Sequence, residues 1–75
     1  MFIDDLRENA RTINRAVRNE NCLNAYIMLG IRETGFAPVR RIIGARVRKN
    51  VLQVKSLNCV AWISVNPDQD IIYFQ

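Results

Sequence analysis

The first part of the chain carries an apolar spacing that allows essentially one kind of local structure. Five apolar residues recur at intervals of three, four, three and four positions: Ile3, Leu6, Ala10, Ile13 and Val17. This spacing draws one narrow stripe along one side of an α-helix. Asp4 and Asp5 fall in the first turn, where a carboxylate interacts favourably with the helix dipole. We therefore expect a helix over residues 3–18, with a stripe that must be covered by something else.

A second apolar segment follows the polar residues 19–21. Between Cys22 and Ile31 the apolar side chains surround a helical axis instead of lining one side of it. A helix that is apolar all round is buried on several faces. The segment predicts a second helix over residues 22–33, ended by Gly35 in a left-handed cap. The first helix then packs on the second or, as the alternative, pairs with its copy in a homodimer.

The middle of the chain is less clear. Pro38 stands where proline is favoured, in the first turn of a helix, and residues 38–47 are expected to be helical. Residues 48–57 fit two structures: Lys55 falls inside the apolar arc of a helix, whereas the valines favour a strand that alternates imperfectly. We choose the helix because it is consistent with the fold that the other segments suggest.

The end of the chain predicts a β-hairpin. Residues 60–65 are rich in β-branched and aromatic residues, residues 66–70 are polar and turn-like, and residues 71–74 form a second apolar run. The hairpin carries three aromatic side chains, for which two roles are open. They form its buried face, or they stack on nucleobases as in proteins that bind single strands. These side chains are Trp62, Tyr73 and Phe74.

Charge is distributed unevenly along the chain. Residues 1–33 hold five basic and five acidic residues, whereas residues 34–67 hold six basic residues and no acidic one. A stretch of 34 residues without an acid concentrates positive potential, which is typical of a protein with a polyanionic partner. The alternative is chance composition in an arginine-rich chain. The six basic residues are Arg40, Arg41, Arg46, Arg48, Lys49 and Lys55.

The residue types that most catalytic and metal sites need are missing or scattered. Histidine is absent, and the three glycines do not form a phosphate-binding loop. The two cysteines, Cys22 and Cys59, are too few for a disulfide framework and are expected to be reduced and buried. The sequence thus predicts a protein that is not an enzyme and holds no metal or other cofactor.

Targeting signals are also missing from the sequence. The first residues lack the basic and apolar regions of a signal peptide. The longest apolar run, residues 25–29, is far shorter than the roughly 20 residues that cross a bilayer. We expect a cytoplasmic protein with no membrane partner.

The order of these elements resembles the winged helix-turn-helix superfamily from Leu23 to Gln75. Residues 23–35 stand where the first helix of that module lies, and residues 38–47 where the second lies. Arg48-Lys49-Asn50 corresponds to the turn and the start of the third helix, and Leu57 to Val60 to the exit from it. Residues 61–74 are similar to the wing, with its tip at residues 66–70.

The resemblance implies an α+β, mainly α, fold with three core helices, a hairpin wing and one extra N-terminal helix. The whole chain, residues 1–75, is then a single domain. Within it, residues 1–20 are the extra helix, residues 21–58 the three-helix core and residues 59–75 the wing.

The resemblance also implies a mechanism on double-stranded DNA, with the third helix in the major groove. Lys49, Asn50 and Gln53 are then the candidates for reading bases. Asn66 and Gln69 at the wing reach the backbone or the minor groove. Lys55 belongs to the same basic segment. Phosphates are bound by the arginines, namely Arg40, Arg41, Arg46 and Arg48.

Two classes of function follow from these expectations. The first is a small sequence-specific DNA-binding protein, a regulator of transcription or replication of the kind found in bacteria and mobile elements. The alternative is a small interaction module or inhibitor that binds a larger protein, which the acidic tip of the wing fits better. Salt separates the two, because each phosphate contact makes affinity fall steeply with salt.

Overall fold

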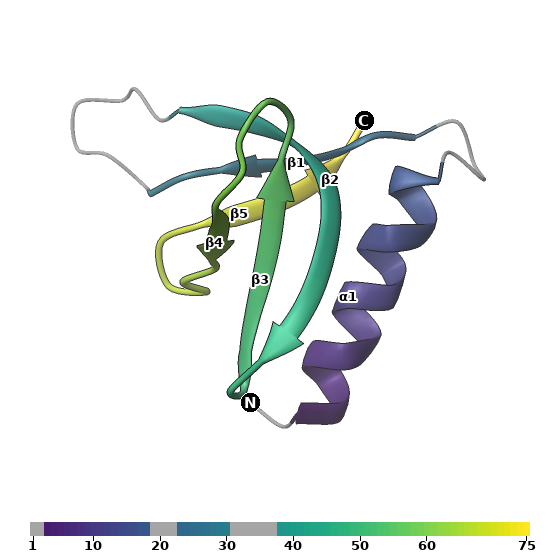
Figure 1. The fold of residues 1–75 in the computed structure, drawn as a ribbon, viewed down its shortest axis with the longest axis vertical. Helices are drawn as coiled ribbons and strands as arrows, with labels where there is room; N and C mark the ends of the chain where they lie inside the picture. Colours follow the sequence, from purple (N-terminus) through teal and green to yellow (C-terminus); the bar gives the residue numbers. More distant parts are fainter. Residues whose placement is uncertain (1–2, 19–22, 31–37) are drawn as a thin grey trace.

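The structure, a computed structural model, describes residues 3–18, 23–30 and 38–75. It consists of one helix followed by five strands (Figure 1). In chain order these are α1 (Ile3–Val17), β1 (Ala25–Met28), β2 (Val39–Arg48), β3 (Val51–Ser56), β4 (Trp62–Ser64) and β5 (Ile71–Phe74).

The five strands form one antiparallel sheet in the order β4-β3-β2-β1-β5. The long strand β2 belongs to both halves of it. Its first residues pair with β1 and the remainder pairs with β3. In Figure 1, β3 runs vertically whereas β1 and β5 run across the picture, so β2 bends to connect two strand directions. A β-bulge between Ile42 and Gly44 lies on this strand, and bulges bend and twist the strands that contain them.

The mainly α fold predicted from the sequence is therefore wrong. The expected second helix contains β1, in which Ala25 and Ile27 are buried and Tyr26 and Met28 are half-buried. The expected helix over residues 38–47 is most of β2, which holds four β-branched residues, and such residues favour strands. In β1, buried and half-buried residues alternate as in a strand with one face on the core, whereas in β2 a bulge interrupts the alternation. The winged-helix arrangement has no counterpart in the described residues.

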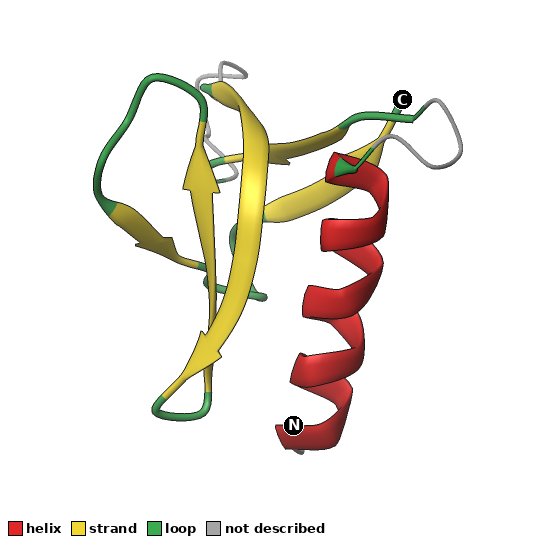
Figure 2. Cartoon of the chain, turned by 45° about the vertical axis from the view of Figure 1, so that its right-hand side comes forward, coloured by secondary structure: helices red, strands yellow, loops and turns green. Residues whose placement is uncertain are grey.

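The expected helix over residues 48–57 is also wrong, because β2 and β3 form a tight hairpin (Figure 2). The two residues at its turn, Lys49 and Asn50, have φ angles of 52° and 61°. Two consecutive positive φ angles fit a type I′ turn, whose twist matches that of the flanking strands. The position of Lys55, which no helical wheel accommodated, is ordinary in a strand because every second residue of β3 faces outward.

The last two strands lie close to their predicted positions, yet they do not form a hairpin with each other. β4 pairs with β3 and β5 pairs with β1, at opposite edges of the sheet. The predicted turn over residues 66–70 is present and is tied down by Asp70. Its carboxylate accepts hydrogen bonds from the backbone N–H of Asn66 at 2.8 Å and of Gly30 at 2.7 Å. Asp70 therefore fixes this turn to the end of β1.

The predicted N-terminal helix is confirmed as α1, and it packs on the sheet instead of on another helix (Figure 1). Its stripe lies against buried side chains from the first three strands. The core comprises Leu6, Ala10, Ile13 and Ala16 of α1 with Ala25, Ile27, Ile42, Ala45, Leu52 and Val54 of the sheet. The homodimer through this helix stays a prediction, although three residues of the stripe are buried within the chain itself.

A polar side chain of α1 supplies hydrogen bonds to the backbone of β2 on the side where β1 does not reach. Because β1 pairs with β2 only over residues 39–41, Ala45 has no β1 partner on that side. The side chain of Asn14 takes this place: its Oδ1 accepts from Ala45 N at 2.9 Å and its Nδ2 donates to Ala45 O at 3.0 Å. The amide thus pairs with the strand in the way that a neighbouring strand would.

We expect the substitution Asn14→Leu to lower the free energy of unfolding by about 1–3 kcal/mol, because it leaves two part-buried backbone groups of Ala45 unpaired. Urea denaturation measures this change. The control is Asn9→Leu, the same substitution at an exposed position of α1, which should alter stability by less than about 0.5 kcal/mol. Equal losses in the two variants would show that Asn14 does not hold β2.

Candidate nucleic-acid interface

Alternation along the strands gives the sheet a face directed away from the core. In β3 every second side chain is buried, so those between them point outward. The cross-strand register carries the outward positions to the neighbouring strands. We call this surface of β2, β3 and β4 the outer face; it comprises Gly44, Arg46, Arg48, Val51, Gln53, Lys55, Trp62 and Ser64.

A polar row crosses the outer face from β2 to β4. Arg46, Gln53 and Ser64 are aligned by the register of the three strands. Arg46 Nε donates to Gln53 Oε1 at 2.8 Å, and Gln53 Nε2 is 3.4 Å from Ser64 Oγ. The first bond is short and holds the guanidinium in one orientation. The second is at the long limit of a hydrogen bond and is easily exchanged for a ligand.

The indole of Trp62 lies beside this polar row, in the neighbouring row that Gly44 and Lys55 form with it. The Arg46 Cζ atom is 4.0 Å from the centroid of the Trp62 ring, a cation–π contact. The far edge of the ring, Trp62 Cη2, comes within 3.9 Å of the place that a Cβ would take at Gly44. The indole therefore extends from β4 over β3 as far as β2.

The charge of the outer face is positive and is not balanced within the sheet. None of the five strands contains an aspartate or a glutamate. Partial burial lowers the pKa of the Arg46 guanidinium from its usual value, and the positive charge of Arg48 lowers it further. Two like charges lie close together on a surface that offers them no carboxylate.

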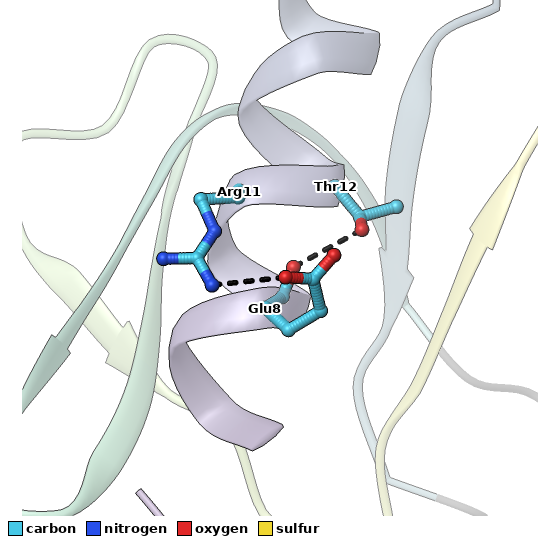
Figure 3. Close-up of polar contacts among 3 residues, drawn as sticks. All are labelled: Glu8, Arg11 and Thr12. Carbon is cyan, nitrogen blue, oxygen red and sulfur yellow. Dashed lines mark hydrogen bonds and ion pairs between the residues drawn. The ribbon is translucent and has the colours of Figure 1, made fainter. Parts of the chain in front are cut away.

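One arginine of α1, Arg11, has a carboxylate partner. Arg11 Nη2 contacts Glu8 Oε2 at 2.9 Å, and the Oγ1 of Thr12 donates to the backbone oxygen of Glu8 at 3.0 Å (Figure 3). The hydrogen bond from Arg11, together with the charges of Arg11 and Arg15, holds the pKa of the Glu8 carboxyl below its usual value. The contact between Arg11 and Glu8 is the one ion pair between described side chains. The basic residues of the sheet, in contrast, have no described carboxylate as a partner.

The structure brings together four of the residues predicted to bind DNA. Arg46, Arg48, Gln53 and Lys55 all lie on the outer face, although on strands and not on a recognition helix. Lys49 and Asn50 form the turn that joins β2 and β3, next to Arg48, and both are exposed.

Four further predicted residues lie elsewhere. Arg41 is on β2 beyond the bulge, aligned with Tyr26 of β1. Arg40 is aligned with the buried Ile27 and so belongs to the opposite side of the sheet from Arg41. Asn66 and Gln69 are in the turn before β5, where the Asn66 Oδ1 accepts a hydrogen bond from the backbone of the same turn. These positions do not form a wing tip.

Four members of the outer face were not assigned to DNA binding from the sequence, namely Gly44, Val51, Trp62 and Ser64. The sequence left base stacking open as a role for Trp62. It placed Trp62 in a hairpin with the last strand, however, and gave it no partner residue. The signal that locates it is the alternation of β2 and β3, which puts Arg46 and Lys55 on one side of the sheet. Cys59, expected to be buried, is exposed; Cys22 lies outside the described residues.

The chain matches no protein-family model, no curated protein and no solved structure. No helix within the described ranges has the length and the apolar character needed to cross a membrane. Within the same ranges, cysteine and carboxylate side chains do not gather in a group of three or more that suits a metal ion.

We expect Arg46→Ala to expose Trp62, because the guanidinium covers one side of the indole. Trp62 is the single tryptophan of the chain, so its emission reports this contact directly. The Stern–Volmer constant for quenching by acrylamide should rise. Arg48→Ala, two residues along the same strand, serves as the control and should leave the constant unchanged. Equal increases in the two variants would mean that Arg46 does not cover the ring.

Proposed function

We propose that the chain binds single-stranded nucleic acid through the outer face. The observation that carries the proposal is the contact of Arg46 with Trp62, 4.0 Å from cation to ring, on a sheet without a carboxylate. A cationic surface attracts phosphates, and a planar side chain attracts the planar faces of bases. The outer face offers both within three neighbouring strands.

Each part of the site has a counterpart in a single strand. Arg48 and Lys55 supply positive charge to phosphates. The stacked pair of Trp62 and Arg46 supplies a platform for a base, since guanidinium planes and aromatic rings both stack on bases. Gln53 has an amide nitrogen with only one long hydrogen bond, to Ser64. It is therefore available to the edge of a base held on the platform.

A single strand suits this surface better than a duplex. The proposed recognition helix does not exist, which removes the mechanism that favoured the major groove. In a duplex the flat faces of the bases are hidden by stacking, whereas in a single strand they are accessible. A site made of an aromatic ring and an arginine on an open sheet uses those faces. Double-stranded DNA is thus the competing outcome of the test.

The first test compares partners in solution. Fluorescence anisotropy should show tighter binding of the protein to a labelled single-stranded 12-mer, of DNA or of RNA, than to the duplex of the same sequence. With three cations at the site, the slope of log affinity against log salt should be about −2, since each phosphate contact on a single strand contributes about −0.7. Tighter binding to the duplex, or no dependence on salt, contradicts the proposal.

The second test uses substitutions. Trp62→Leu should weaken binding of the 12-mer by about 5- to 150-fold, the range expected for loss of stacking on one base. Arg48→Ala should reduce the salt slope by about 0.7. Arg7→Ala removes the same charge from an exposed position of α1 and is the matched control, with affinity unchanged. If Arg7→Ala weakens binding as much as Arg48→Ala does, attraction to the whole protein explains the affinity.

A protein partner remains a second candidate because of one apolar row. Ile71, Met28 and Val39 are aligned across β5, β1 and β2, and the first and last are 45% and 41% exposed. An exposed apolar row of this kind is a common feature of protein interfaces. Binding there would change little with salt and would not depend on Trp62.

A further inference from the structure

A second aromatic cluster lies on the other half of the sheet. Tyr73 of β5, Tyr26 of β1 and Arg41 of β2 are aligned side by side by the strand register. The two tyrosine rings are stacked, with centroids 5.4 Å apart and an interplanar angle of 19°. Arg41 is exposed and its Nη2 donates to Asn24 Oδ1 at 3.0 Å. We call these three residues the tyrosine row.

The β-bulge places the tyrosine row on the same side of the sheet as the outer face. Arg41 and Arg46 are five residues apart, and in a regular strand an odd separation puts two side chains on opposite faces. The register shift between Ile42 and Gly44 adds one residue to β2. Because of this extra residue Ile42 and Ala45 both point into the core, and Arg41 and Arg46 both point away from it.

The tyrosine row therefore repeats the composition of the first site. Each place combines aromatic rings with an arginine that has no described carboxylate as a partner. Along β2 the two arginines are separated by about 13–16 Å at the usual rise of a strand. At about 3.4 Å per stacked nucleotide this gap corresponds to four or five nucleotides.

We propose that one nucleic-acid strand runs over both places, from Trp62 and Arg46 to the tyrosine row. This inference rests on the proposed function and adds a path and a minimum length to it. The sheet bends around the core between the two places (Figure 1). A single strand is flexible enough to follow a bent surface, whereas a short duplex is stiff and meets such a surface at one place.

The experiment measures affinity against length. Single strands of 3, 6, 9 and 12 nucleotides, as oligodeoxyuridylate and as oligouridylate, are titrated with the intact protein. The 3-mer reaches one place only, whereas the 6-mer, 9-mer and 12-mer are long enough to reach both. We expect Tyr73→Leu to weaken binding of the 12-mer at least about fivefold and to leave the 3-mer unchanged. Trp62→Leu is expected to weaken both lengths.

A second variant guards against a loss of folding in the first. Arg41→Gln changes an exposed residue and should also weaken the 12-mer but not the 3-mer. If both variants bind the 12-mer normally while Trp62→Leu does not, the path over the tyrosine row is wrong and the first site stands. If Trp62→Leu binds every length normally, the proposed function itself fails. The two polymer types show whether the sugar contributes.

Discussion

The fold depends on how the backbone of β2 is hydrogen-bonded beyond the point where its pairing with β1 ends. A strand in the middle of a sheet needs partners on both sides, because a part-buried backbone group without a hydrogen bond costs free energy. From residue 42 onward β2 has β3 on one side, and at Ala45 the amide of Asn14 supplies the pairing on the other. One side chain of a helix thus replaces a strand. This contact allows β1 and β5 to diverge from β3, and it fixes where α1 lies over the core.

The same strand organises the surface. The bulge of β2 both bends the sheet and changes which side chains face outward, so that Arg41 and Arg46 fall on one side. Gly44, next to the bulge, is the residue of β2 that the far edge of the Trp62 indole reaches. A change in local backbone geometry therefore has two results: it bends the sheet, and it brings together aromatic and basic side chains that are far apart in sequence.

Those elements whose signal is local could be predicted from the sequence. The stripe from Ile3 to Val17 has a period that only a helix satisfies, and α1 is present. The helix predicted for the segment before Gly30 was wrong. A short run of apolar residues has no clear period in sequence, and its secondary structure is decided by strands that are distant in sequence. For residues 48–57, consistency with a fold of several helices was given more weight than the strand preference of the valines, and the choice of a helix was wrong. The basic residues of the site were recognised from charge alone, but their partner Trp62 depends on strand register, which no local pattern reveals.

The two edge strands of the sheet affect how readily copies of the protein associate with one another. The outermost strands, β4 and β5, contain three and four residues. A free strand edge is a template on which a second polypeptide extends the sheet, and the risk grows with the length of the edge. Edges this short offer few unpaired backbone groups to such growth. The short edge strands therefore limit fibril-like association of a protein whose main secondary structure is a β-sheet.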